Sequence, residues 1–133
     1  MPTFLEPISL TAATATLTKD HAGCEVFLNR AAGITVTLPA PDAGLRYRFI
    51  VGTAPTTAYT INTDAGANII VLGVNELEVD TSDDGPYDND ADIVTFVANV
   101  AVVGDFLDLY CDGTKWYGRG QTNADGGITS GTT

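Results

Sequence analysis

The chain has 133 residues and is 44% hydrophobic, which fits one globular domain with its own core. Seventeen acidic residues against six basic ones give a formal net charge of −11, so the chain is a poor candidate for binding nucleic acid or an anionic membrane. No apolar run approaches the roughly 20 residues of a membrane helix, and the N-terminus lacks the basic and apolar regions of a signal peptide. We therefore expect a soluble protein that is made in the cytoplasm and binds neither nucleic acid nor membrane.

The N-terminal segment, residues 1–11, contains two prolines together with Phe4 and Leu5. This composition predicts an extended arm with a few anchoring side chains, and Phe4 and Leu5 are the candidate anchors on a partner. A single β domain is expected to follow over residues 12–120.

Short apolar runs separated by Gly, Pro, Asn and Asp make up this domain, and helical periodicity is nearly absent. In residues 34–38 apolar side chains alternate with threonines, as in a strand that buries one face. The pattern predicts an all-β fold, either an antiparallel β-sandwich or a small jelly-roll-like β-barrel, with little or no helix. Strands are expected at residues 12–17, 25–29, 34–38, 46–51, 59–62, 68–72, 76–79, 93–98, 106–111 and 115–119.

The two cysteines, Cys24 and Cys111, each lie within an apolar strand-like run and are too few for a metal site or a disulfide framework. Buried free thiols are expected, with a disulfide as the alternative if the two strands are neighbours. The single histidine, His21, lies in a turn-like stretch, and the chain contains no Gly-x-Ser-x-Gly motif and no phosphate-binding loop. We therefore expect no enzymatic activity and no cofactor.

The expected strand at residues 46–51 carries two of the six basic residues. Arg46 and Arg48 share one face of it, opposite Tyr47 and Phe49. Two guanidinium groups on an exposed face can bind a partner's carboxylates in bidentate fashion, and they can equally pair with the chain's own aspartates. Both interpretations of Arg46 and Arg48 stay open at this point.

An acidic segment, residues 80–92, holds six aspartates in thirteen positions and is expected to be a loop. Clustered carboxylates can bind Ca²⁺, which takes six to eight oxygen ligands. An EF-hand that starts at Asp88 fails, because Ile93 stands where Gly is needed and Asn99 where Glu is needed. A solvated surface loop is the alternative to a calcium site. The candidate ligands are Asp83, Asp84, Asp88, Asp90 and Asp92.

The Asp112-Gly113 dipeptide lies between two expected strands and predicts a tight hairpin. Trp116 and Tyr117 follow it directly, and both residue types are enriched in binding interfaces. They are candidates for a partner-binding patch; the alternative is that one ring packs in the core and the other covers an edge. The last segment, residues 121–133, is polar and Gly-rich, which predicts a flexible tail.

Two stretches, Gly33 to Gly52 and Gly104 to Gly120, contain the motifs Thr-Leu-Pro, Tyr-x-Phe-Ile-Val and Asp-Gly-Thr-Lys-Trp-Tyr. Together they cover 37 of the 133 residues, and they resemble the capsid decoration (cement) proteins of tailed phages. The resemblance implies a β-sandwich or barrel that binds the major capsid protein on the outside of the head, commonly as a homotrimer. It implies a place in the virion, no catalytic residues and no cofactor.

The Asp-Gly-Thr-Lys-Trp-Tyr hairpin also resembles modules of phage tail fibres and spikes. The alternative function is therefore a receptor- or carbohydrate-binding module, with Trp116, Tyr117 and the acidic segment as a sugar site that could include calcium.

If the chain is a decoration protein, we expect residues 1–11 to cross a boundary between capsid subunits and hold the subunits together.

Overall fold

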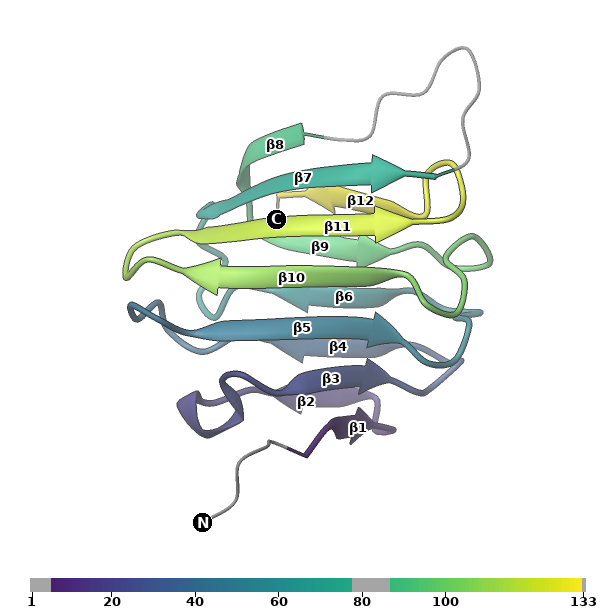
Figure 1. The fold of residues 1–133 in the computed structure, drawn as a ribbon, viewed down its shortest axis with the longest axis horizontal. Coiled ribbons are helices and arrows are strands. Elements are labelled where there is room, and N and C mark those ends of the chain that lie inside the picture. The colour runs from purple at the N-terminus through teal and green to yellow at the C-terminus, as the bar shows by residue number, and fades with distance from the viewer. Residues whose placement is uncertain (1–5, 78–86, 133) are drawn as a thin grey trace.

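The computed structural model describes residues 6–77 and 87–132, which form two β-sheets packed against each other (Figure 1). Within these residues the one helical element is a three-residue 3-10 turn, η1 (Lys19–His21). The fold is an all-β sandwich, which confirms the predicted class. In the same part of the chain, no helix has the length and apolar character needed to cross a membrane.

The larger sheet has seven strands in the order β1-β3-β5-β10-β11-β7-β8 and lies in front in Figure 1. It consists of β1 (Ile8–Leu10), β3 (Glu25–Leu28), β5 (Arg46–Val51), β7 (Ile70–Glu76), β8 (Tyr87–Ala91), β10 (Phe106–Cys111) and β11 (Trp116–Thr122). The smaller sheet has five strands in the order β12-β9-β6-β4-β2. It consists of β2 (Thr14–Thr16), β4 (Ile34–Thr37), β6 (Tyr59–Asn62), β9 (Ile93–Phe96) and β12 (Ile128–Gly131).

The route of the chain explains the directions of the strands. From β1 to β7 the chain crosses to the opposite sheet after every strand, so neighbours within a sheet are reached after one full circuit. Such neighbours run parallel, as β1-β3-β5 and β2-β4-β6 do. The β10–β11 hairpin then fits between β5 and β7, antiparallel to β5. Among the described pairs five are parallel and five antiparallel, so the prediction of an antiparallel sandwich is wrong in this respect.

Alternate side chains of the central strands fill the space between the sheets. In β5, Tyr47, Phe49 and Val51 are fully buried, whereas Arg46 is exposed on the opposite face. The Trp116 ring lies 6.0 Å from the Tyr47 ring, centroid to centroid. The largest fully buried side chains are those of Trp116, Tyr47, Tyr59, Phe49 and Phe96. Burying side chains of this size contributes roughly 1.5–3 kcal/mol each, so these rings account for much of the stability of the sandwich.

Three strands were not predicted. The strand β1 lies within the predicted arm and pairs in parallel with β3, and β12 lies within the predicted flexible tail and pairs with β9. The tail prediction is wrong because Ile128 is fully buried and fixes β12 to the core. The strand β8 occupies part of the predicted acidic loop. The strand expected at residues 68–72 is β7, which continues past Gly73 to Glu76. Of the strand expected at residues 76–79, only Glu76 belongs to β7, and residues 78 and 79 lie outside the described residues.

A buried carboxylate, that of Asp105, fixes the loop before β10 to the end of β11. Its side chain accepts hydrogen bonds from the backbone N–H of Val102 and the Thr122 hydroxyl, and from the backbone and side-chain N–H of Asn123. Asp105 is 1% exposed. Four donors compensate for the loss of hydration of this buried side chain.

Candidate functional site

The outer face of the larger sheet, meaning the side turned away from the smaller sheet, carries a patch of charged and aromatic side chains. The register of the strands aligns them in rows, because residues opposite each other on neighbouring strands share a face. The charged row contains Glu25, Arg48, Asp108, Arg119 and Gly73. The aromatic row contains Arg46, Tyr110, Tyr117 and Val71.

The centre of the charged row is a bidentate ion pair between β5 and β10. The Arg48 Nε–H donates to Asp108 Oδ1 at 2.6 Å, and a terminal Arg48 N–H donates to Asp108 Oδ2 at 3.1 Å. This hydrogen-bonded carboxylate raises the pKa of Arg48 above its usual value. The same guanidinium lies over the Phe106 ring, 4.6 Å from its centroid. Arg48 is therefore held in place on two sides and its charge is largely matched.

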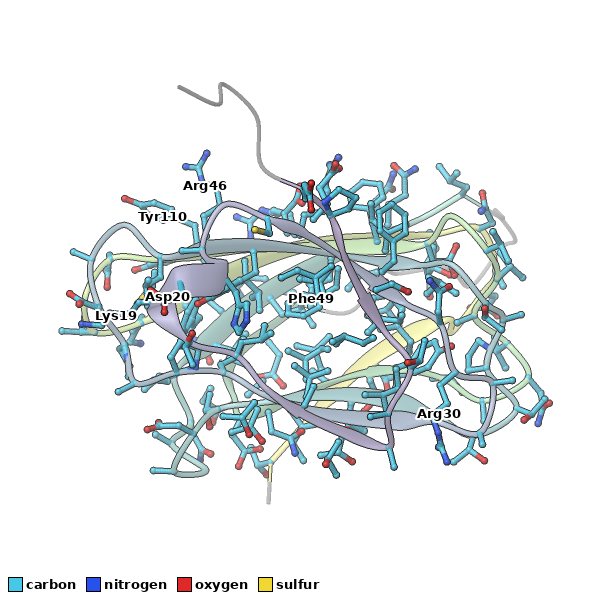
Figure 2. All side chains as sticks on the ribbon, turned by 90° about the horizontal axis from the view of Figure 1, so that it is seen from below. Lys19, Asp20, Arg30, Arg46, Phe49 and Tyr110 are labelled. Atoms are coloured by element: carbon cyan, nitrogen blue, oxygen red, sulfur yellow. The ribbon has the colours of Figure 1, made fainter. Side chains whose placement is uncertain are left out.

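The second arginine of β5, Arg46, has a different environment. Its guanidinium lies 5.1 Å from the centroid of the Tyr110 ring and projects from the outer face with that ring, while Phe49 points between the sheets (Figure 2). No described carboxylate lies within 4 Å of the Arg46 side-chain nitrogens. A guanidinium stacked on an aromatic ring keeps its in-plane N–H donors free for a ligand.

The third guanidinium of this face belongs to Arg119 of β11. One of its N–H groups donates to the carbonyl of Gly118 at 2.8 Å, and no described carboxylate lies within 4 Å of it. Its side chain extends toward Gly73 on β7, where a Cβ atom would lie 3.5 Å from a terminal nitrogen of Arg119 and 3.7 Å from its Cδ. These are ordinary van der Waals distances, so the Arg119 side chain lies directly over Gly73 on β7.

The three arginines surround a hollow of about 410 Å³ over β5, β10 and β11. Asp108 is the one carboxylate in its lining, so the charged side chains that line it carry a net charge of +2 in a chain of −11. Tyr110 and Tyr117, which are 41% and 40% exposed, form part of its wall. A second hollow of about 410 Å³ lies on the other side of Arg119, over β7 and β11. This arrangement can bind an anionic group against aromatic surface.

The turn before β11 holds Tyr117 in position. Asp112 Oδ1 accepts hydrogen bonds from the backbone N–H of Lys115 at 2.8 Å and of Thr114 at 2.9 Å. These donors lower the pKa of Asp112, and the Tyr117 hydroxyl contributes to the same shift. The hairpin predicted from Asp112-Gly113 is confirmed, because β10 and β11 pair on either side of this turn. Gly113 has φ +108°, a conformation that residues with a side chain rarely adopt.

The structure brings together three of the predicted partner-binding residues, Arg46, Arg48 and Tyr117, on one face. Trp116 does not belong with them, because it is fully buried in the core, and the prediction of a surface contact for Trp116 is wrong. Adjacent residues of a strand point to opposite faces, so Trp116 packs in the core and Tyr117 lies on the outer face. This agrees with the alternative interpretation, in which one of the two rings is part of the core. Phe4 and Leu5 lie outside the described residues.

Sequence reasoning missed three members of the patch, Asp108, Tyr110 and Arg119. The signal for Asp108 and Tyr110 in the sequence is that residues 106–111 do not alternate cleanly between apolar and polar. The reason is that β10 has apolar side chains on its buried face and also the aromatic Phe106 and Tyr110 on its outer face. Placing Arg119 in the same row as Arg48 requires the order of the strands.

The acidic segment does not form a cluster in the part of the chain that is described. Asp88 accepts hydrogen bonds from the Asp90 backbone N–H at 3.0 Å and from the Ser130 hydroxyl at 2.7 Å, and these lower its pKa. Asp88 in turn raises the pKa of Asp90. Asp92 is 1% exposed, and no group of three or more potential metal-binding side chains occurs in residues 6–77 and 87–132. Asp83 and Asp84 lie outside these ranges.

Both cysteines are free thiols: Cys111 is buried and Cys24 is half-buried beside the hollow. The single histidine, His21, accepts a hydrogen bond at Nδ1 from the backbone N–H of Thr18 and so caps the 3-10 turn.

Comparison with known proteins finds no matching family model, no matching curated protein and no matching solved structure.

Proposed function

We propose that this protein is a phage head decoration (cement) protein that binds the outside of the major capsid protein shell and stabilises it. The observation that supports it most is the patch on the larger sheet, where three arginines and two half-exposed tyrosines surround the hollow. Arg and Tyr dominate the energetics of protein interfaces, and a rigid sheet presents them with little loss of conformational entropy. The resemblance of the motifs in residues 33–52 and 104–120 to decoration proteins is the reason for proposing the phage head as the partner assembly.

Docking on a symmetric shell adds a second physical advantage. A stable contact buries roughly 800 Å² per partner, and a trimer that makes three such contacts gains avidity from each additional one. Dissociation then requires all contacts to break together. Sedimentation analysis of the purified protein tests the homotrimer directly, because a monomer at micromolar concentration would contradict this part of the proposal.

The decisive experiment uses heads that lack this protein. Purified protein is added, and both the amount bound and the survival of the heads on heating are measured. The double variant Arg46→Gln/Arg119→Gln should bind at least about tenfold more weakly. The matched control, Thr14→Glu/Thr129→Glu, makes the same change in net charge on exposed positions of the smaller sheet and should bind normally. Equal binding by both variants would place the contact elsewhere.

The predicted arm needs a modified truncation. Removal of residues 1–11 would delete β1, whose Ile8 and Leu10 pack against the core. Removal of residues 1–5 leaves β1 in place and tests Phe4 and Leu5 alone. We expect the shortened protein to fold and to protect heads less well; full protection would contradict the role of the arm.

A receptor- or carbohydrate-binding module of a tail fibre or spike is the second candidate. It is favoured by the size of the hollow, since small-molecule sites measure roughly 300–1,000 Å³, and by Tyr110 and Tyr117 beside hydrogen-bonding side chains. Because Trp116 is buried, such a sugar site would be lined by Tyr110 and Tyr117. Labelled antibody on virions separates the two functions: many copies on the head support decoration, and a few on the tail support adhesion.

A further inference from the structure

Three guanidinium groups, those of Arg46, Arg48 and Arg119, line the hollow on the outer face. Arg48 uses two of its donors on Asp108 and is matched by that carboxylate. Arg46 and Arg119 have no ion-pair partner among the described carboxylates, although the chain has seventeen acidic residues. In so acidic a chain, two such arginines in one hollow indicate that the partner supplies the missing anions.

The strand order and register set the distance between Arg46 and Arg119, the two arginines without an ion-pair partner among the described residues. Arg46 and Arg119 lie on strands β5 and β11 with β10 between them, and their rows differ by two residues along the strand. Strand spacing and rise then place their Cα atoms about 12 Å apart. Both side chains reach the same hollow, so their guanidinium groups can bind two anions that belong to one ligand.

The charge and the surroundings indicate which anion fits. Two guanidinium groups match two single negative charges, and each can accept a carboxylate in a bidentate fork. The net charge of −11 repels a long polyanion such as DNA more strongly than a short segment with two carboxylates, because the repulsion grows with the charge of the ligand. The stacking of Arg46 on Tyr110 and the contact of Arg119 with the Gly118 carbonyl hold both groups in place before binding. Alternate side chains of an extended segment lie on one face, about 7 Å apart for the nearest and about 13 Å for the next.

We infer that the hollow between Arg46 and Arg119 binds two carboxylate side chains, at alternate positions of an extended acidic segment of the partner protein, with the backbone of that segment lying along Tyr110 and Tyr117. This inference names the partner chemistry of the proposed docking face and rests on that function. The inference goes beyond the proposed function because it assigns the contact to Arg46 and Arg119. Arg48 and Asp108 then form a fixed ion pair beside the ligand and do not bind it.

The test uses a synthetic peptide and needs no capsid. The probe is acetyl-Glu-Gly-Glu-Gly-Glu-amide, the control is the same peptide with Gln for Glu, and binding is followed by amide chemical shifts of the labelled protein. We expect saturable shifts in β5, β10 and β11 with the Glu peptide and none with the Gln peptide. Shifts spread evenly over the molecule, or equal effects of both peptides, would overturn the inference.

Variants then separate the geometry from simple attraction. Arg46→Gln/Arg119→Gln should weaken peptide binding at least about tenfold. Arg46→Lys/Arg119→Lys keeps the charge but loses the planar fork, and it should lose a large part of the affinity. Thr14→Glu/Thr129→Glu should bind as the unchanged protein does. Full affinity of the lysine variant would show that net charge alone is responsible and would contradict bidentate recognition.

The outcome is distinguishable from failure of the proposed function. Peptide binding without binding to heads would overturn decoration and leave the carboxylate site intact. Binding to heads that is unaffected by Arg46→Gln/Arg119→Gln would overturn the site and leave decoration intact. Glucuronate that saturates the same shifts, with no effect of the Glu peptide, would replace the protein segment by an acidic sugar and overturn the inference.

Discussion

The outer faces of the two sheets differ sharply in chemistry although they share one backbone pattern. Across the smaller sheet, the register aligns five threonines in one uncharged row: Thr14, Thr35, Thr60, Thr95 and Thr129. Across the larger sheet, the corresponding central row alternates in charge from Glu25 to Arg119. Threonine is β-branched, suits a pleated surface and hydrogen-bonds to water, so a row of threonines needs no partner.

The difference shows what a solvent-exposed strand requires and what exceeds that requirement. On the smaller sheet, the threonine row meets this requirement without any charged side chain. The larger sheet instead carries three arginines and exposed tyrosines that contribute little to folding, since an exposed ion pair is worth only about 0–1 kcal/mol. Residues that stability does not demand are the ones to test for binding. The variants below examine whether the two faces can be separated in this way.

The largest loss of stability is expected from a substitution in the core that supports both faces. Trp116→Ala should cost about 3–5 kcal/mol of unfolding free energy, because it empties a fully buried site beside Tyr47. The neighbouring Tyr117→Ala should cost less than about 1 kcal/mol and should weaken partner binding. Urea denaturation measures both. Similar stability losses in the two variants would contradict the assignment of one ring to the core and the other to the outer face.

The buried carboxylate of Asp105 and the exposed carboxylate of Asp108 should differ in their contribution to stability. Asp105→Asn replaces an acceptor of four hydrogen bonds by an amide that cannot accept them all, and it should cost about 2–4 kcal/mol. Asp108→Asn acts on a side chain that is 46% exposed and should cost less than about 1 kcal/mol. The midpoint in urea is again the measurement, and a larger loss for Asp108 would show that the outer pair is structural.

Alkaline pH provides a test of smaller effect. Burial, together with smaller contributions from the nearby Cys24 and Cys111, raises the pKa of Tyr47 to about 12. Since the unfolded chain releases this proton near pH 10, the contribution of Tyr47 to stability is complete below pH 10 and is lost between pH 10 and about 12. Tyr47→Phe should cost about 1 kcal/mol near pH 7, through the lost hydrogen bond to the Thr18 carbonyl, and should flatten this decline.

Thermal unfolding at a series of pH values measures the effect. Tyr110→Phe is the matched control, because Tyr110 lies on the outer face, and its unfolding should follow the pH dependence of the unchanged protein. An equally steep decline in the Tyr47→Phe protein would assign the alkaline transition to another group.

The smallest effect is expected on the threonine row. Thr35→Val removes one exposed hydroxyl from a strand and should change stability by less than about 0.5 kcal/mol. Binding to heads and to the Glu peptide should be unchanged. A clear loss of binding in this variant would mean that the smaller sheet also contacts the partner, and that the two faces do not divide the tasks.

The sequence alone predicted the local features of this protein. The alternation of apolar and polar residues gave the all-β class and the bounds of β5, β6 and β10, because the direction of a side chain in a strand depends only on its parity. The same parity placed Arg46 and Arg48 on one face. It could not tell which of Trp116 and Tyr117 was buried, because both are large and amphipathic.

Only the tertiary structure decided which strands are neighbours. The parallel pairs follow from a chain that circles between two sheets, and the place of the β10–β11 hairpin follows from the gap left between β5 and β7. Apart from the β10–β11 hairpin, which the Asp112-Gly113 turn predicted, these pairings join residues far apart in the chain, and no local pattern encodes them. They bring Arg48 beside the hairpin residues Asp108 and Arg119, and they bury Ile128 of an otherwise polar segment. The hollow exists because of strand order, whereas the residues that line it obey the local alternation.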